Sequence, residues 1–166
     1  LGCADAGNLI PMAVNLPDAQ FVGVDISARH IADGQKLVDR LGLTNIRLLH
    51  QSILDIDPSS GVYDYIIAHG VFSWVPEAVQ EKILEICRQQ LRPQGIAFVS
   101  YNTYPGWHLR GMLRDMMMYH TRRFEDPQQQ IGQARALIRF LAGEVPTKDN
   151  PYGLLLTREL EDIQRW

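Results

Sequence analysis

The chain has 166 residues, of which 46% are hydrophobic and 21% are charged, the composition of one ordinary soluble globular domain. A chain of this length buries roughly 70% of the surface that its unfolded form exposes, so its core needs no disulfide or metal for support. Sixteen Lys and Arg against 19 Asp and Glu give a net charge of -3, which argues against a protein that covers nucleic-acid phosphates.

The sequence gives expectations about localisation, metal binding and the start of the chain. Nothing in the chain has the length and apolar character of a membrane span or a secretory signal, so we expect a cytoplasmic protein without membrane contact. Cys3, Cys87 and the five His residues lack metal-ligand spacing, so no metal site is predicted. The opening on Leu1 is typical of a fragment cut inside a strand, and we expect exposed sheet edge and apolar surface beside the missing part.

Short β-branched segments alternate with amphipathic ones along the first part of the chain, which is typical of βαβ units and a parallel sheet. After a first strand of which only the end remains, strands are predicted over residues 21–25, 45–50, 63–68 and 96–100. The third of these, 63–68, is apolar enough to be covered on both faces. Helices are predicted over residues 8–16, between Ser27 and Gly42, and over 76–91, with a turn at 92–95.

The helix ends rest on capping residues. Ser27 is a suitable N-cap, Gly42 a suitable C-terminal stop, and Pro76 suits the first helical position because it lacks an N–H. Beyond the last strand the pattern changes to three amphipathic segments, at residues 107–124, 128–143 and 153–165.

The fold class that follows is α/β, a Rossmann-like doubly wound and mostly parallel sheet with helices on both faces, followed by a helical C-terminal segment. We divide the chain into a core of residues 1–106 and a helical extension of residues 107–166. In such a sheet, ligands bind outside the carboxyl ends of the strands, so the residues that follow each strand are the informative ones.

Two strand ends carry a nucleotide-binding pattern. Residues 2–7 form a turn of small residues that leads into a helix, whose first N–H groups can hold an anionic group. Asp25 ends the next strand, where a carboxylate can accept hydrogen bonds from two ribose hydroxyls. The alternative is that Asp25 only caps the helix that begins near Ser27. Together the turn and the carboxylate favour a nucleoside ligand.

Four stretches of sequence resemble a known family. LGC at residues 1–3, GNLIP at 7–11 and FVGVDIS at 21–27 resemble the first two motifs of class I S-adenosylmethionine-dependent methyltransferases. YDYIIAHGVFSWVP at 63–76 and SYNTYPGWH at 100–108 resemble the bacterial subgroup that carries a methyltransferase regulatory domain and includes protein lysine methyltransferases. The resemblance implies a cytoplasmic enzyme that uses S-adenosylmethionine as cofactor and transfers its methyl group to an acceptor, with a protein lysine as one acceptor class.

The resemblance also implies site residues. The residues expected to contact the cofactor are Gly2, Ala4, Ala6, Gly7, Asp25, Ile26, Ser52, Ile53, His69 and Gly70. The first four would line its amino-acid half, Asp25 its ribose, Ser52 and Ile53 its adenine, and the last two its methionine part. The chain departs from the family pattern at Ala4 and Ala6, where glycine is expected, at Asp5, where a small residue is usual, and at Ser52, where an acidic residue is common.

Aromatic residues after the last two strands suit the methyl acceptor, because ring faces stabilise a sulfonium or an ammonium ion. The expected acceptor pocket consists of Phe72, Trp74, Tyr101, Tyr104 and Trp107, which must then lie close together. Ordinary packing of these rings is the alternative. His69 and Tyr101 are the candidates for a catalytic role, although a lone His after a strand more often makes a local hydrogen bond.

Two other functions remain open from the sequence. The pattern Gly2-x-Ala4-x-x-Gly7 followed by Asp25 also fits the fingerprint of an NAD-dependent oxidoreductase with one substitution. A non-catalytic module, which would use the helices after residue 107 as an interaction surface, is the second alternative. Neither the identity of the acceptor nor the oligomeric state follows from the residues.

Overall fold

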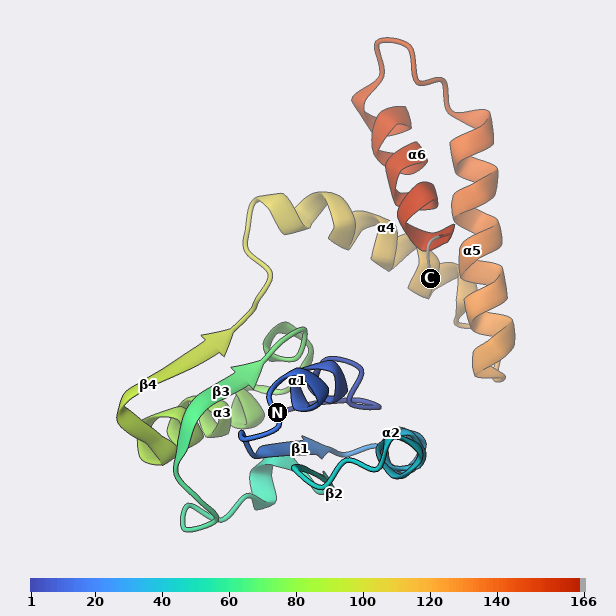
Figure 1. The fold of residues 1–166 in the computed structure, drawn as a ribbon. Coiled ribbons are helices and arrows are strands. Elements are labelled where there is room, and N and C mark those ends of the chain that lie inside the picture. The colour runs from blue at the N-terminus through green and yellow to red at the C-terminus, as the bar shows by residue number, and fades with distance from the viewer. Residues whose placement is uncertain (165–166) are drawn as a thin grey trace. The chain divides into compact units, whose positions relative to one another are not determined.

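The computed structural model describes residues 1–164 (Figure 1). The chain forms two compact units, the first from Leu1 to Tyr101 and the second from Asn102 onward. The sequence places the boundary five residues later, after residue 106, and that division into domains stays a prediction.

The first unit is a parallel α/β structure, as predicted. Its elements in chain order are α1 (Leu9–Asn15), β1 (Phe21–Asp25), α2 (Ala28–Leu41), β2 (Ile46–His50), the 3-10 helix η1 (Ile53–Asp55), β3 (Tyr63–Ala68), the 3-10 helix η2 (Phe72–Trp74), α3 (Glu77–Gln90) and β4 (Leu91–Val99). β1 pairs in parallel with β2, and β3 pairs in parallel with β4. The Rossmann-like arrangement inferred from the alternating pattern is thereby confirmed.

Helices cover both faces of the strands (Figure 1). On one face, Ile10 and Ala13 of α1 and Val38 of α2 pack against Ile46 and Leu48 of β2. On the other face, Val24 of β1 and Ile66 of β3 pack with Ile86 of α3. Because side chains alternate along a strand, one strand contributes to both clusters.

The predicted helix caps are confirmed with one shift. Ser27 is the N-cap of α2 and its Oγ accepts a hydrogen bond from His30 N at 3.3 Å. Gly42 ends that helix with a φ of +64°, the left-handed conformation that glycine adopts without a Cβ clash. Pro76 is the N-cap of α3 instead of its first residue, so the helix begins at Glu77.

The predicted turn at residues 92–95 is wrong, because these residues lie within β4. Tyr63 pairs with Leu91 and Tyr65 with Ile96, so a step of two residues in β3 faces a step of five in β4. The extra residues form an irregularity in the ladder. Such a bulge tolerates Pro93, which has no N–H to donate to a neighbouring strand.

The expectation that β3 is covered on both faces is also wrong. Ile66 and Ala68 are buried, whereas Tyr65 keeps 67% of its surface exposed. α3 covers the face that carries Ile66, and the helices of the other face pack mainly against β1 and β2. An apolar run of six residues does not by itself distinguish one covered face from two.

β1 and β3 belong to separate strand pairs. Residues at the start of the chain lie between them, where Cys3 N donates to Val24 O at 3.0 Å and the Leu1 amine donates to Ile67 O at 2.7 Å. A cavity of about 150 Å³ lies beside these contacts, lined in part by Val22, Ile66 and Ile86. None of the predicted cofactor residues is among the residues that line it.

The second unit is helical, as predicted. It comprises α4 (Gly106–Thr121), α5 (Pro127–Glu144) and α6 (Pro151–Gln164), and the predicted end of the last helix at residue 165 lies outside the described residues. Leu113, Ile138 and Leu156 form its buried centre. None of the helices in the described part of the chain is long and apolar enough to cross a membrane. Residues 1–164 also contain no cluster of His, Cys, Asp and Glu that could hold a metal ion.

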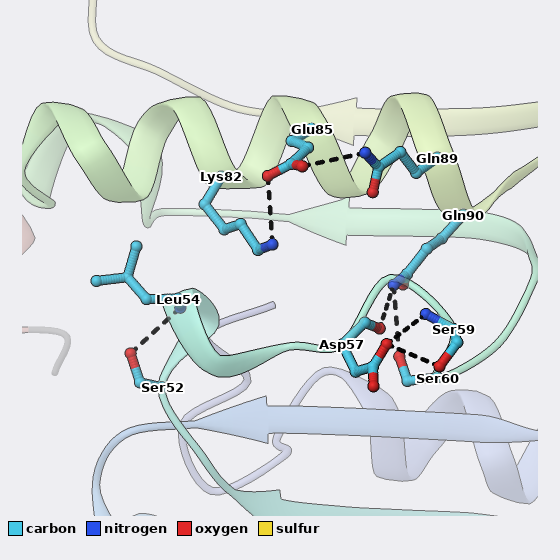
Figure 2. Close-up of polar contacts among 9 residues, drawn as sticks. All are labelled: Ser52, Leu54, Asp57, Ser59, Ser60, Lys82, Glu85, Gln89 and Gln90. Atoms are coloured by element: carbon cyan, nitrogen blue, oxygen red, sulfur yellow. Dashed lines mark hydrogen bonds and ion pairs between the residues drawn. The ribbon is translucent and has the colours of Figure 1, made fainter.

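The buried side-chain amide of Gln90 connects the end of α3 to the loop before β3 by hydrogen bonds (Figure 2). Gln90 is 1% exposed, and its Nε2 donates to Asp57 O at 2.8 Å and to Ser60 Oγ at 3.4 Å. Within the loop, the backbone N–H and the hydroxyl of Ser59 donate to the Asp57 carboxylate and lower the pKa of that group.

Gln90→Ala is therefore expected to lower the free energy of unfolding by roughly 1 kcal/mol, because both acceptors lose their buried donor. The control is Gln89→Ala, since Gln89 is exposed and its Nε2 donates to Glu85 on the helix surface at 3.0 Å. Urea unfolding of both variants measures the difference, and equal losses would contradict the role of Gln90.

Candidate functional site

The turn at residues 2–7 has the backbone shape of a glycine-rich turn although two of its residues are alanine. Gly2, Ala4 and Ala6 have φ values of +65°, +48° and +63°. The left-handed conformation costs a non-glycine residue roughly 1 kcal/mol, so the surrounding structure must hold it in place. The departures from glycine at positions 4 and 6 thus leave the shape of the turn intact.

Two strand ends meet at this turn. Ala4 N donates to Asp25 Oδ2 at 2.8 Å, which connects the turn to the end of β1. A Cβ on Gly2 would clash with the side chain of Val71, which follows β3. The carboxyl ends of β1 and β3 therefore converge on residues 2–4, where the topology of a parallel sheet places its ligands.

Asp25 has two backbone partners. Besides Ala4, its Oδ1 accepts from Ser27 N at 2.8 Å, while Ser27 itself caps α2. Asp25 is therefore not the helix cap, but it links the cap to the turn. Each carboxylate oxygen has two lone pairs, so Asp25 retains capacity to accept ribose hydroxyls.

The remaining residues of the turn differ in exposure. Asp5 Oδ1 accepts from Gly7 N at 3.1 Å, so this carboxylate folds back onto the turn that carries it. Ala6 is fully buried in the cluster under α1, where it supports the turn from within and presents no open surface to a cofactor. Burial raises the pKa of the Cys3 thiol, which disfavours the nucleophilic thiolate.

The segment after β2 begins beside Asp25, because Gln51 N donates to Asp25 O at 3.0 Å. Ser52 follows, and its Oγ accepts from Leu54 N at 3.2 Å as the N-cap of η1 (Figure 2). Ile26 is 74% exposed at the end of β1. The structure thus brings the predicted ribose and adenine residues to one edge.

The ends of β3 and β4 are joined by a hydroxyl. Ser100 Oγ accepts from Gly70 N at 2.8 Å and lies 3.0 Å from His69 Nδ1. Phe72 and Tyr101 lie next to each other, with ring centroids 6.2 Å apart. These two members of the predicted acceptor pocket are therefore neighbours.

The other members of that pocket stay predictions. Trp74 belongs to η2 and is 52% exposed. Tyr104 and Trp107 belong to the second unit, where the Tyr104 ring lies against the His108 ring with centroids 4.3 Å apart.

Sequence reasoning missed three residues that shape the site: Gly34, Val71 and Ser100. A Cβ on Gly34 of α2 would lie 2.6 Å from the backbone oxygen of Asp5, so only glycine lets the helix approach the turn this closely. The signal was present, because an isolated glycine inside a predicted helix usually has a packing reason.

Comparison with known proteins places this geometry in a family. The model of the family described as "Methyltransferase domain" matches residues 1–97, which contain the turn, Asp25, His69 and Gly70. The chain belongs to this methyltransferase family. The resemblance to class I S-adenosylmethionine-dependent methyltransferases is confirmed, and family membership decides against an NAD-dependent oxidoreductase.

Several relatives of the methyltransferase domain are bacterial. An uncharacterized protein of Rickettsia prowazekii is 48% identical over 159 residues, which cover 96% of this chain and 29% of the relative. A second uncharacterized protein of that organism is 40% identical over 166 residues, which cover 100% of this chain and 66% of the relative. The chain thus spans less than a third of the length of the first relative and about two thirds of the length of the second.

Solved structures show the same fold. PKMT2 from Rickettsia typhi in complex with AdoHcy has a TM-score of 0.80 and 41% identity, covering 99% of this chain and 32% of that one. The plantazolicin methyltransferase BpumL in complex with SAH has a TM-score of 0.50 and 16% identity, covering 99% of this chain and 68% of that one. The second likeness concerns the fold alone.

Proposed function

We propose that this methyltransferase domain binds S-adenosylmethionine at the carboxyl edge of its strands and transfers the methyl group to a lysine side chain of a protein. The observation that carries the proposal is the convergence of Asp25, the turn at residues 2–7 and the end of β3 on one edge. The likeness to PKMT2, a protein lysine methyltransferase whose structure holds AdoHcy, supports both the cofactor and the acceptor class.

The residues present fit the cofactor. Asp25 offers a carboxylate with free lone pairs to the ribose, and Gly70 has a φ of +69° with nothing within 4 Å of a Cβ placed on it. Gly2, Ala4 and Gly7 would lie along the amino-acid half, Ile26, Ser52 and Ile53 around the adenine, and His69 with Gly70 at the methionine part. Ala6 is buried, so it would affect cofactor binding only by holding the shape of the turn at residues 2–7.

When bound, S-adenosylmethionine supplies an activated methyl group on a sulfonium, so the domain has little covalent chemistry to perform. Its residues would orient the acceptor in line and exclude water. The adjacent rings of Phe72 and Tyr101 offer their faces to cationic groups, with Trp74 of the same unit as a further proposed member of the acceptor pocket. Tyr101 remains the candidate for contact with the reacting atoms.

The wider setting is also a proposal. The bacterial relatives support a bacterial enzyme, and the free thiols of Cys3 and Cys87 support a reducing compartment such as the cytoplasm. The acidic net charge of -3 supports a protein acceptor over a nucleic acid.

Calorimetric titration of the full-length protein tests the cofactor. S-adenosylmethionine and S-adenosylhomocysteine are expected to bind, because residues 1–97 match the methyltransferase domain family. NAD is not expected to bind. Transfer of a radiolabelled methyl group to poly-L-lysine, with poly-L-arginine as the matched control, tests the acceptor. Binding of NAD alone would contradict the cofactor, and binding of S-adenosylmethionine without any transfer would favour the non-catalytic module.

A further inference from the structure

His69 follows β3, and two neighbours restrain its ring. Nδ1 lies 3.0 Å from Ser100 Oγ, and the ring packs at a tilt against Phe98 with centroids 5.7 Å apart. Ser100 itself follows β4, and its backbone N–H continues the ladder by donating to Ala68 O at 3.1 Å. His69 is an exposed residue whose Nε2 takes no part in these contacts.

The contact with Gly70 determines the direction of the hydrogen bonds. A backbone N–H can only donate, so Ser100 Oγ accepts from Gly70 N at 2.8 Å and keeps its own proton for a second bond. A hydroxyl that accepts one hydrogen bond becomes a better donor, which favours the series Gly70 N–H, Ser100 O–H, His69 Nδ1. In this series Nδ1 accepts, so the neutral imidazole carries its proton on Nε2.

We infer that Ser100 is a positioning residue that makes His69 a hydrogen-bond donor at Nε2, and that this donor binds a carboxylate oxygen of the ligand. A nitrogen that carries a proton cannot accept another, so this role excludes His69 as the general base. The inference rests on the proposed function for the identity of the ligand. Of the groups at the methionine end of S-adenosylmethionine, the ammonium and the sulfonium repel an N–H donor, whereas the carboxylate attracts it.

The tautomer is tested without any ligand. Full-length protein with 15N-labelled histidine gives a long-range 1H–15N spectrum that shows which nitrogen carries the proton at a pH where the imidazole is neutral. The wild-type protein and Ser100→Thr, which keeps the hydroxyl, are expected to show His69 with the proton on Nε2. Ser100→Ala is expected to show a mixture of both forms. A wild-type spectrum with the proton on Nδ1 would overturn the inference.

The ligand group is tested by removing it. Calorimetry compares S-adenosylhomocysteine with its decarboxylated analogue on wild-type protein, His69→Phe, Ser100→Ala and Ser100→Thr. His69→Phe keeps a ring beside Phe98 and is expected to weaken S-adenosylhomocysteine binding on the order of tenfold, the value of one charge-assisted hydrogen bond, with little effect on the analogue. Ser100→Ala should weaken it in the same selective way, and Ser100→Thr should restore it.

Equal weakening of both ligands by His69→Phe would overturn the assignment of the carboxylate. Failure of the wild-type protein to bind S-adenosylhomocysteine would instead contradict the proposed function, and the spectrum would still decide whether Ser100 sets the tautomer. The two failures are therefore distinguishable.

Discussion

Asp25→Ala is expected to weaken cofactor binding on the order of 10-fold to 100-fold, because the ribose hydroxyls lose charge-assisted hydrogen bonds that water only partly replaces. The same change removes the acceptor of Ala4 N and Ser27 N, both at 2.8 Å. We therefore also expect a loss of stability of roughly 2 kcal/mol, since two partly buried backbone donors lose their partner. Calorimetric titration with S-adenosylhomocysteine and urea unfolding of the full-length protein measure the two effects.

Asp39→Ala is the matched control for charge. Asp39 is exposed on α2 and its carboxylate accepts from Gln35 Nε2 at 2.8 Å on the helix surface, so its removal should change neither quantity appreciably. A loss of stability in Asp25→Ala with unchanged affinity would contradict the ribose role and leave Asp25 as a structural link between the turn and α2.

Gly34→Ala is expected to lower the free energy of unfolding by about 1 to 3 kcal/mol, because the new Cβ overpacks the site. That Cβ would lie 2.6 Å from Asp5 O and 2.9 Å from Asp5 C, backbone atoms that cannot rotate aside. The turn must shift to relieve the contact, so affinity for S-adenosylhomocysteine should also fall, on the order of tenfold. Urea unfolding and calorimetry again give both quantities.

Gly132→Ala is the matched control, and it is expected to raise the free energy of unfolding. Gly132 lies inside α5 with nothing within 4 Å of a Cβ placed on it. Replacing such a glycine by alanine stabilises a helix by roughly 0.5 to 1 kcal/mol, since alanine has less backbone entropy to lose. If Gly34→Ala stabilised the protein to the same extent, the close approach of α2 to the turn would be refuted.

The elements of the first unit could be read from the sequence because their signals are local. The periodicity of residues 21–25 and 46–50 lies within each strand, and Ser27 caps α2 through a residue only three positions away. Two local signals were ambiguous. The apolar run of β3 predicted a second covered face, and the Pro and Gly residues at 92–95 predicted a turn, but the packing produced neither.

The family motifs predicted Gly2, Asp25, His69 and Gly70 as site residues, but they did not predict what each residue contacts. Asp25 reaches Ala4 across 21 residues, and Ser100 reaches His69 across 31. The small space that requires Gly34 exists only because α2 packs on the turn. By itself the sequence determined most of the elements and the α/β class, because capping and periodicity act over a few residues, and its motifs resembled those of the family. Only the tertiary structure decided the partners of Asp25, the hydrogen bond to His69 and the need for Gly34, because these depend on atoms that meet when distant segments pack.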